Sequence, residues 1–149
     1  MDSVYPYDLS KSCSDLICQS YSKVYGLKIG ILRCGNLYGP GDLNIKRIVP
    51  ETIIQTLNNK NLIIRSSGKL TRDYLYIDDA TKAYLLVLNK LSQSKNRLLI
   101  YNVGSKYNLN VLQIVKKILK IMKKEKLKPV IQNSSKQELE TQKLNYKKI

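Results

Sequence analysis

Tyr7 and Lys11 stand four residues apart near the start of the chain. In a helix this spacing brings both side chains out on the same face. Cations beside a phenol stabilise the phenolate, which can then accept a proton from a hydroxyl group. The pair therefore predicts a general acid or base at Tyr7, tuned by Lys11. A surface tyrosine near a solvated lysine has the same spacing, so both interpretations stay open on these two residues alone.

The composition is that of one packed unit with a large positive charge. The chain has 149 residues, of which 43% are hydrophobic, and a net charge of +15. This length suits one domain or part of one, and the apolar content suffices for a core. Such a charge attracts nucleic acid or an anionic surface. The lysines are spread among Ile, Leu and Asn without interleaved stacking aromatics, so a nucleic-acid binder ranks last among the functions considered.

The cysteines and the absent histidines argue against a metal site. Cys13, Cys18 and Cys34 form no C-x-x-C pair, and the chain has no histidine. No zinc site is therefore expected, and an odd cysteine count without a disulfide framework fits a reducing compartment. No apolar run reaches the length of a membrane span, and the first residues do not form a signal peptide. The sequence predicts a cytoplasmic protein without a membrane partner.

The first part of the chain has the pattern of a helix followed by a strand. Apolar residues with helical spacing predict a helix over 10–25 that ends at Gly26. Its buried stripe should comprise Cys13, Leu16, Ile17, Tyr21 and Val24. The apolar run 28–34 predicts a parallel strand covered on both faces. The glycine-rich stretch 35–42 follows it and predicts a ligand-binding turn at the carboxyl end of that strand.

The middle of the chain predicts a helix and two strands. Pro50 should open the helix at its first position, with Ile53, Ile54 and Leu57 on the apolar side. Residues 62–65 and 73–77 have strand character, and a turn at 66–69 separates them.

Two more helices and a strand complete the α/β order. Asp78 or Asp79 should cap a helix whose inward residues are Ala80, Ala83, Tyr84, Val87, Leu88 and Leu91. Residues 98–103 predict an apolar strand. Asn110 should cap a last helix that buries Leu112, Val115, Ile118, Leu119 and Met122. The lysines on the opposite side of that helix are expected to form a solvated face.

Five motifs in order resemble the extended short-chain dehydrogenases, the NAD-dependent sugar-nucleotide epimerases and dehydratases. They lie at 7–11 (Y-x-x-S-K), 32–41 (L-R-x-x-N-x-Y-G-P-G), 72–79 (R-D-Y-x-Y-I-x-D), 101–105 (Y-N-V-G-S) and 110–112. Each motif is short, but together their spacing is specific. The residues of the first two motifs and those beside them look most similar to the CDP-glucose 4,6-dehydratase branch.

The resemblance implies an α/β fold that is only partly present. Residues 1–35 would be the C-terminal remnant of the NAD-binding Rossmann domain. Residues 36–149 would form most of the small sugar-nucleotide-binding domain, with 98–105 a strand that returns to the main sheet. The family's opening G-x-x-G-x-x-G motif is absent from the seven glycines. The resemblance therefore predicts a fragment truncated at both ends, with a partial Rossmann-like sheet.

The same resemblance implies roles for six residues. Tyr7 and Lys11 would be the catalytic pair and, with Cys34, would border the NAD cofactor. Asn36 and Arg72 would bind the diphosphate of a nucleoside-diphosphate sugar, where a guanidinium suits paired oxygens, and Arg47 would lie near the nucleotide. No metal is expected.

Three functions follow as hypotheses. The first is a sugar-nucleotide 4,6-dehydratase or epimerase part that is inactive alone and works with a complementing N-terminal half. The second is a non-catalytic remnant or a dimerisation module, since the Tyr/Lys helix packs in a homodimer interface in the family. Nucleic-acid binding is the third. The sequence does not choose between a dehydratase and an epimerase.

Overall fold

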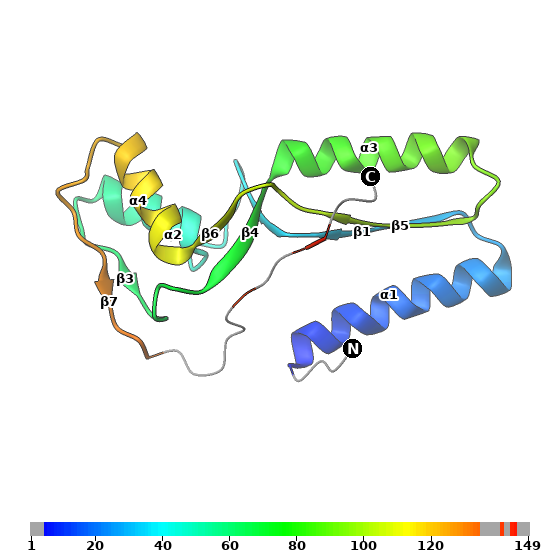
Figure 1. Ribbon diagram of the computed structural model, residues 1–149, viewed down its shortest axis with the longest axis horizontal. Coiled ribbons are helices and arrows are strands. Elements are labelled where there is room, and N and C mark those ends of the chain that lie inside the picture. Colours follow the sequence, from blue (N-terminus) through cyan, green and yellow to red (C-terminus); the bar gives the residue numbers. More distant parts are fainter. Residues whose placement is uncertain (1–4, 135–140, 142–143, 146–149) are drawn as a thin grey trace.

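The computed structural model describes residues 5–134, 141 and 144–145 (Figure 1). Its elements run α1 (Pro6–Tyr25), β1 (Ile29–Cys34), β2 (Asn36–Tyr38), α2 (Ile48–Leu57), β3 (Ile63–Ile64), β4 (Thr71–Tyr76), α3 (Ile77–Gln93), β5 (Leu98–Val103), β6 (Asn108–Asn110), α4 (Val111–Ile121) and β7 (Val130–Ile131). We call β1, β5, α1 and α3 the open lobe, and the remaining elements the packed lobe. The α/β class predicted from the sequence is confirmed.

The open lobe is a pair of parallel strands between two helices. β1 pairs with β5 in a register that runs from Ile29 beside Leu98 to Cys34 beside Val103. The helix α3 lies on one side of this pair and α1 on the other (Figure 1). Val87 and Leu91 of α3 are buried against the face of β5. This arrangement matches the prediction of a strand with helices on both faces.

The predicted apolar stripe of α1 is wrong. The helix ends at Gly26 in the left-handed conformation (φ 66°), as expected. However, Leu16, Ile17 and Val24 are 64%, 57% and 68% exposed, and Cys13 and Tyr21 are exposed too. The helix instead turns its polar side inward, where Asp15 accepts from Arg33 of β1 and the Ser22 hydroxyl donates to the carbonyl of Leu27, just before β1.

The helix α2 also differs from its prediction. It begins at Ile48, so Pro50 is its third residue and not its first. Thr52 and Thr56 are buried, whereas the predicted apolar side is exposed, namely Ile53, Ile54 and Leu57. Burial of the threonines is possible because each hydroxyl donates to the carbonyl four residues earlier. The packing of α2 against α4 decides which face is inside.

The helix α3 buries Ala80, Val87 and Leu91 as predicted. The predicted burial of Tyr84 and Leu88 is wrong, since these residues are 54% and 62% exposed. They lie on the flank of α3, where the described chain provides nothing to cover them. Tyr76 occupies the N-cap position, so the predicted caps, Asp78 and Asp79, are first-turn residues instead.

The packed lobe is built on a three-stranded sheet in the order β2-β4-β6. β2 runs parallel to β4 within the stretch predicted to be only a turn, and β6 runs antiparallel to β4. A separate parallel pair joins β3 to β7. The helix α4 begins with the predicted Asn110 cap, which forms a reciprocal pair with Gln113. The lobe's core is made of Leu62, Ile64, Tyr74, Ile114, Val115, Ile118 and Leu119.

No helix in the described part of the chain is both long enough and apolar enough to span a bilayer.

Candidate functional site

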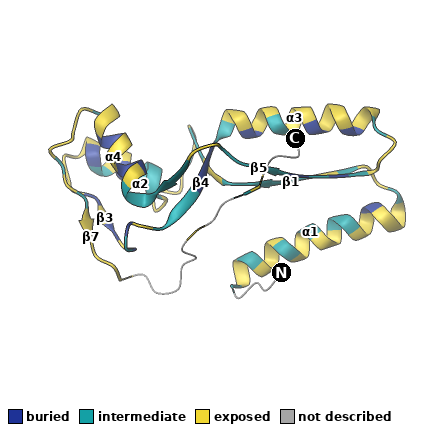
Figure 2. Ribbon diagram, viewed as in Figure 1, coloured by how far each residue is buried: buried dark blue, intermediate teal, exposed yellow. Residues whose placement is uncertain are grey.

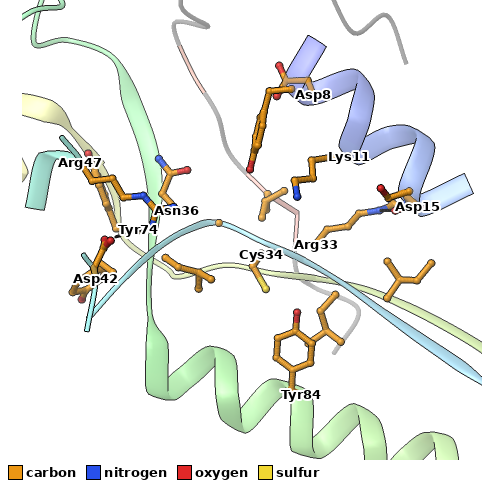
Figure 3. Close-up of a pocket in the computed structure, with 18 of the residues that line it drawn as sticks. Asp8, Lys11, Asp15, Arg33, Cys34, Asn36, Asp42, Arg47, Tyr74 and Tyr84 are labelled. Atoms are coloured by element: carbon orange, nitrogen blue, oxygen red, sulfur yellow. Dashed lines mark hydrogen bonds and ion pairs between the residues drawn. The ribbon is translucent and has the colours of Figure 1, made fainter. Parts of the chain in front are cut away.

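A cavity of about 840 Å³ lies at the carboxyl end of β1, where the two lobes meet. It is lined by five of the six predicted site residues: Tyr7, Lys11, Cys34, Asn36 and Arg47. They come from α1, β1, β2 and the loop before α2 (Figure 3). The carboxyl ends of parallel strands are where open α/β sheets bind ligands. The fold thus brings together side chains that lie up to 40 positions apart in the sequence.

The Tyr7 and Lys11 side chains leave α1 on the same face, as their spacing predicts. The Lys11 Nζ atom lies 5.4 Å from the centroid of the Tyr7 ring, within the range of a cation–π contact. Tyr7 is 70% exposed, so its hydroxyl is open to a ligand in the cavity. Lys11 projects from α1 toward β1 (Figure 3). The two side chains are therefore neighbours at the wall of the cavity.

An ion pair that the sequence analysis missed fixes this helix to the sheet. Arg33 of β1 donates to both carboxylate oxygens of Asp15 in α1, over 2.7 and 3.1 Å. The Arg33 hydrogen bond lowers the pKa of Asp15, and Asp15 raises the pKa of Arg33. Both residues line the cavity beside Lys11. Asp15 follows Lys11 by four residues, so the helical period that linked Tyr7 to Lys11 could have found it.

Cys34 lies where β1 reaches the cavity, and its surroundings are tightly packed. Burial raises the pKa of the Cys34 thiol, which leaves it a poor nucleophile. A side chain at Gly35 would place its Cβ 2.7 Å from the Asp73 carbonyl oxygen. Asp73 is 2% exposed and accepts from the Ser105 amide over 2.7 Å. The segment that carries Cys34 is therefore held between the lobes.

The other side of the cavity carries residues predicted to bind the sugar nucleotide. Asn36 is exposed in β2, and Arg47 pairs with Asp42 over 3.3 Å. Arg72 is the exception among the predicted residues, because it is not among the side chains lining this cavity. Its Nη1 atom donates to the Thr71 carbonyl over 3.0 Å.

Three tyrosines that the sequence analysis did not assign to the site also line the cavity, namely Tyr38, Tyr74 and Tyr84. Tyr74 of β4 is buried, which raises the pKa of its phenol, while the nearby Arg72 opposes that shift. Tyr84 reaches the cavity from α3, on the opposite side of β1 from Lys11 (Figure 3). The helical pattern had assigned Tyr84 to the core, and apolar periodicity alone gives no signal for a cavity beside a strand.

The cavity brings cationic, acidic and phenolic side chains together. Lys11, Arg33 and Arg47 line it with Asp8, Asp15 and Asp42, and Arg33 and Arg47 are paired with Asp15 and Asp42. Tyr7 adds an exposed phenol. Among the described residues no cluster of three or more histidine, cysteine or acidic side chains could hold a metal ion.

Comparison with known proteins finds matches to one family model and to several relatives. Residues 1–104 match the family model described as the NAD dependent epimerase/dehydratase family. The chain is 39% identical over 116 residues to the dTDP-D-glucose 4,6-dehydratase of Dictyostelium discoideum, covering 78% of this chain and 26% of that protein. It is 30% identical over 128 residues to the human dTDP-D-glucose 4,6-dehydratase, covering 86% of this chain and 35% of the relative.

Solved structures match over nearly the whole chain. The UDP-glucose 4-epimerase of Thermotoga maritima, crystallised with UDP-glucose, superposes with a TM-score of 0.84 at 26% identity. A variant of the Bacillus cereus UDP-glucuronic acid 4-epimerase, in complex with NAD and a fluorinated UDP-sugar, gives the same TM-score at 27% identity. The two matches cover 96% and 97% of this chain but 45% of each structure. The chain therefore belongs to the NAD-dependent epimerase/dehydratase family.

Proposed function

We propose that this chain supplies the Tyr/Lys pair and part of the substrate site of a sugar-nucleotide 4,6-dehydratase or epimerase. We further propose that turnover requires a separate cofactor-binding part. The observation that carries this proposal is the single cavity lined by Tyr7, Lys11, Cys34, Asn36 and Arg47. In this proposal residues 1–35 complete a cofactor-binding domain, and 36–149 belong mainly to the substrate domain. The matched region spans 26% and 35% of these two dehydratase relatives.

In the proposed reaction Tyr7 takes the proton from the C4 hydroxyl of the sugar. The Lys11 ammonium, on the same face of α1, stabilises the phenolate form of Tyr7 that accepts this proton. For a dehydratase, water would then be lost across C5 and C6, and the hydride that the cofactor accepts from C4 would return to C6, giving a 4-keto-6-deoxy sugar. Asn36 is the proposed contact to the diphosphate from within the cavity, and Arg72 would approach the diphosphate from outside the cavity lining. Arg47 would lie near the nucleotide, where it could exchange its Asp42 partner for a ligand oxygen.

The residues around the cavity fit one end of a nicotinamide cofactor. NAD, when bound, supplies the hydride acceptor for oxidation at C4. Lys11 and Tyr7 would hold its ribose, and the half-buried Cys34 thiol would lie beside its ring. The chain has no G-x-x-G-x-x-G motif for the pyrophosphate, which the complementing part must supply.

The proposal also names the nucleotide that the sugar substrate carries. The motifs of this chain look most similar to the CDP-glucose branch, whereas the named relatives act on dTDP-D-glucose or, in the plant trifunctional enzymes, UDP-glucose. We propose CDP-glucose first, with dTDP-glucose and UDP-glucose as the alternatives. The free cysteines Cys13, Cys18 and Cys34 are in keeping with activity in the cytoplasm.

The test is reconstitution of turnover with a cofactor-binding part. This chain is co-expressed with the N-terminal part of the Dictyostelium dehydratase that precedes the matched segment. The purified pair is then given NAD and each of the three sugar nucleotides, and the 4-keto product is measured. We expect product with one nucleotide, and a loss of about 10³-fold or more in kcat for Tyr7→Phe. Tyr25→Phe, at the far end of the same helix, is the matched control and should keep full activity. Formation of a complex without product from any of the three would refute the proposed activity.

The exposed apolar stripe of α1 favours a second candidate, a homodimerisation module. Leu16, Ile17 and Val24 together form a stripe with no cover in the described chain. Sedimentation of the wild-type chain and of Ile17→Glu decides this point. A dimer that Ile17→Glu dissociates supports the module, and a monomeric wild-type chain rejects it.

A further inference from the structure

The helix α4 and the loop that follows it carry a dense concentration of positive charge. Seven lysines and a single acidic residue, Glu125, lie within the 13 residues 116–128, so this stretch holds +6 of the chain's net charge of +15. All seven lysines are exposed. We call them the lysine face: Lys116, Lys117, Lys120, Lys123, Lys124, Lys126 and Lys128.

The packing of α4 fixes the direction of the lysine face. This helix buries four apolar side chains in the core of the packed lobe. Lys116, Lys117 and Lys120 alternate with these residues along the helix, so they project from the opposite side. The other four lysines follow the end of α4. Figure 1 shows α4 in the part of the molecule away from α1, and none of the seven lysines lines the cavity of the candidate site. The lysine face is therefore a separate surface.

Little within the described chain neutralises this charge. None of the seven lysines forms an ion pair with a carboxylate of the described residues. The Lys124 Nζ atom donates to the Asn59 side chain over 2.7 Å, and the Lys117 Nζ atom lies 5.5 Å from the centroid of the Tyr107 ring. An amide and an aromatic ring do not cancel an ammonium charge. The lysine face therefore presents its positive field to an external anion.

Two side chains with apolar surface stand beside these lysines. Ile121 is 79% exposed and lies one helical turn after Lys117, and Tyr107 is 61% exposed against the same lysine. Lysines that flank exposed aliphatic and aromatic groups are typical of a peripheral membrane surface, where anionic headgroups attract the cations and the apolar groups enter the interface. Nucleic-acid surfaces instead contact bases through Arg, Asn or Gln and stack them on several rings. The lysine face contains no arginine, which favours the bilayer.

We propose that the lysine face binds the surface of a bilayer that contains anionic phospholipids. Lysines within about 10 Å of such a surface are attracted to it, and a cluster of this size suffices for attachment. Ile121 enters the headgroup region, while the buried side of α4 stays in its core. This attachment is peripheral and needs no membrane-spanning helix. It departs from the prediction of no membrane partner, which was based on the lack of an apolar run, and it is independent of the proposed activity.

Sedimentation with lipid vesicles tests this proposal on the full chain. The protein is mixed with vesicles of phosphatidylcholine alone or with about 30% phosphatidylserine added. We expect at least about 10-fold tighter binding to the anionic vesicles, and release of the protein at about 0.5 M salt. The triple variant Lys116→Gln, Lys120→Gln and Lys126→Gln should bind about 100-fold more weakly, since each lysine contributes roughly a factor of five.

A matched triple variant separates the lysine face from the net charge. Lys23→Gln, Lys82→Gln and Lys95→Gln together remove the same charge from exposed positions in and beside α1 and α3. This control should lose less than about 3-fold in affinity for the anionic vesicles, because its lysines lie away from the bilayer. All six substitutions are at exposed positions, so both variants should keep the wild-type circular dichroism spectrum.

Duplex DNA is the competing partner in the same experiment. Ile121→Gln should weaken vesicle binding severalfold and leave any affinity for DNA unchanged, since only the bilayer accepts an apolar side chain. Three results would overturn the proposal. The first is equal binding to neutral and anionic vesicles. The second is an equal loss for the two triple variants, which makes the net charge responsible. The third is tighter binding to DNA than to vesicles at the same salt concentration, lost in the lysine-face variant, which makes a nucleic acid the partner.

Discussion

The two lobes differ in how completely they bury their own apolar residues (Figure 2). In the packed lobe, α4 directs Ile114, Val115, Ile118 and Leu119 into a core shared with β3 and β4. In the open lobe, Ser22 is the only fully buried residue of the 20-residue helix α1. Hydrophobic burial is the main stabilising term in folding. The packed lobe thus contains its own core, whereas the open lobe displays apolar surface that the described residues leave uncovered.

The largest expected effect is a difference in the free energy of unfolding between two variants, one with a substitution in each lobe. Val115→Asp places a charge at a position that is 0% exposed, and should cost more than about 4 kcal/mol in the free energy of unfolding. Leu16→Asp on the exposed stripe of α1 should change it by less than about 0.5 kcal/mol. Urea denaturation followed by circular dichroism measures both. Equal losses for the two variants would mean that α1 is as well buried as α4, and would abolish the distinction.

A smaller effect is expected where the lobes join. Gly35→Ala would push a methyl group against the backbone of Asp73, so it should destabilise the protein by about 1–3 kcal/mol. The matched variant Gly41→Ala meets no atom within 4 Å, and its cost should be only the positive φ of 81°, about 1 kcal/mol. The same denaturation experiment ranks them. If Gly41→Ala costs more, the junction is looser than its contacts indicate.

Thiol reactivity compares two positions within the open lobe. Burial raises the pKa of Cys34, and the thiolate is the species that reacts, so alkylation of Cys34 should be severalfold slower than that of the exposed Cys13 at pH 8. Iodoacetamide labelling with peptide mass spectrometry gives both rates in one sample. A faster reaction at Cys34 would show that the cavity beside β1 exposes that thiol more than the fold indicates.

The smallest effect concerns the ion pair that holds α1 on β1. Asp15→Asn should lower the free energy of unfolding by about 0.5–1 kcal/mol at pH 7, since the Arg33 side chain is 36% exposed and water screens the pair. Arg33 lowers the pKa of Asp15, so the stabilisation is complete above pH ~4 and disappears as the pH falls through the lowered pKa. Wild type and variant should therefore converge once the pH lies below the lowered pKa of Asp15. A difference that persists at that pH would assign the effect to packing instead.

The sequence predicted where helices and strands lie better than it predicted which face of each helix is buried. The Asn110 cap and the apolar stripe of α4 were both correct, because cap, period and burial agree there. For α1 the period was correct and the buried face was wrong. Periodicity reports which side of a helix is apolar, but it does not report whether the chain contains anything to cover that side. The same reason explains the misplaced Leu88.

The candidate site was predictable in its parts and not in its arrangement. The resemblance supplied Tyr7, Lys11 and Asn36, and the fold brings them to one cavity. It could not supply the Asp15–Arg33 bond or the approach of Tyr84, because these depend on how two helices meet a strand. Their roles, like those assigned to the six predicted residues, remain predictions for the experiments above.

The register of β1 with β5 also sets the order in which this protein can fold during synthesis. Ile29 pairs with Leu98, roughly 70 residues later in the chain. At about 5–20 residues per second, a ribosome needs roughly 4–14 s to add that length. Throughout that interval α1 and β1 have left the exit tunnel without the strand that pairs with them. The segment that carries Tyr7, Lys11 and Cys34 thus emerges several seconds before the strand that pairs with β1, and a nascent-chain chaperone can bind it during that time.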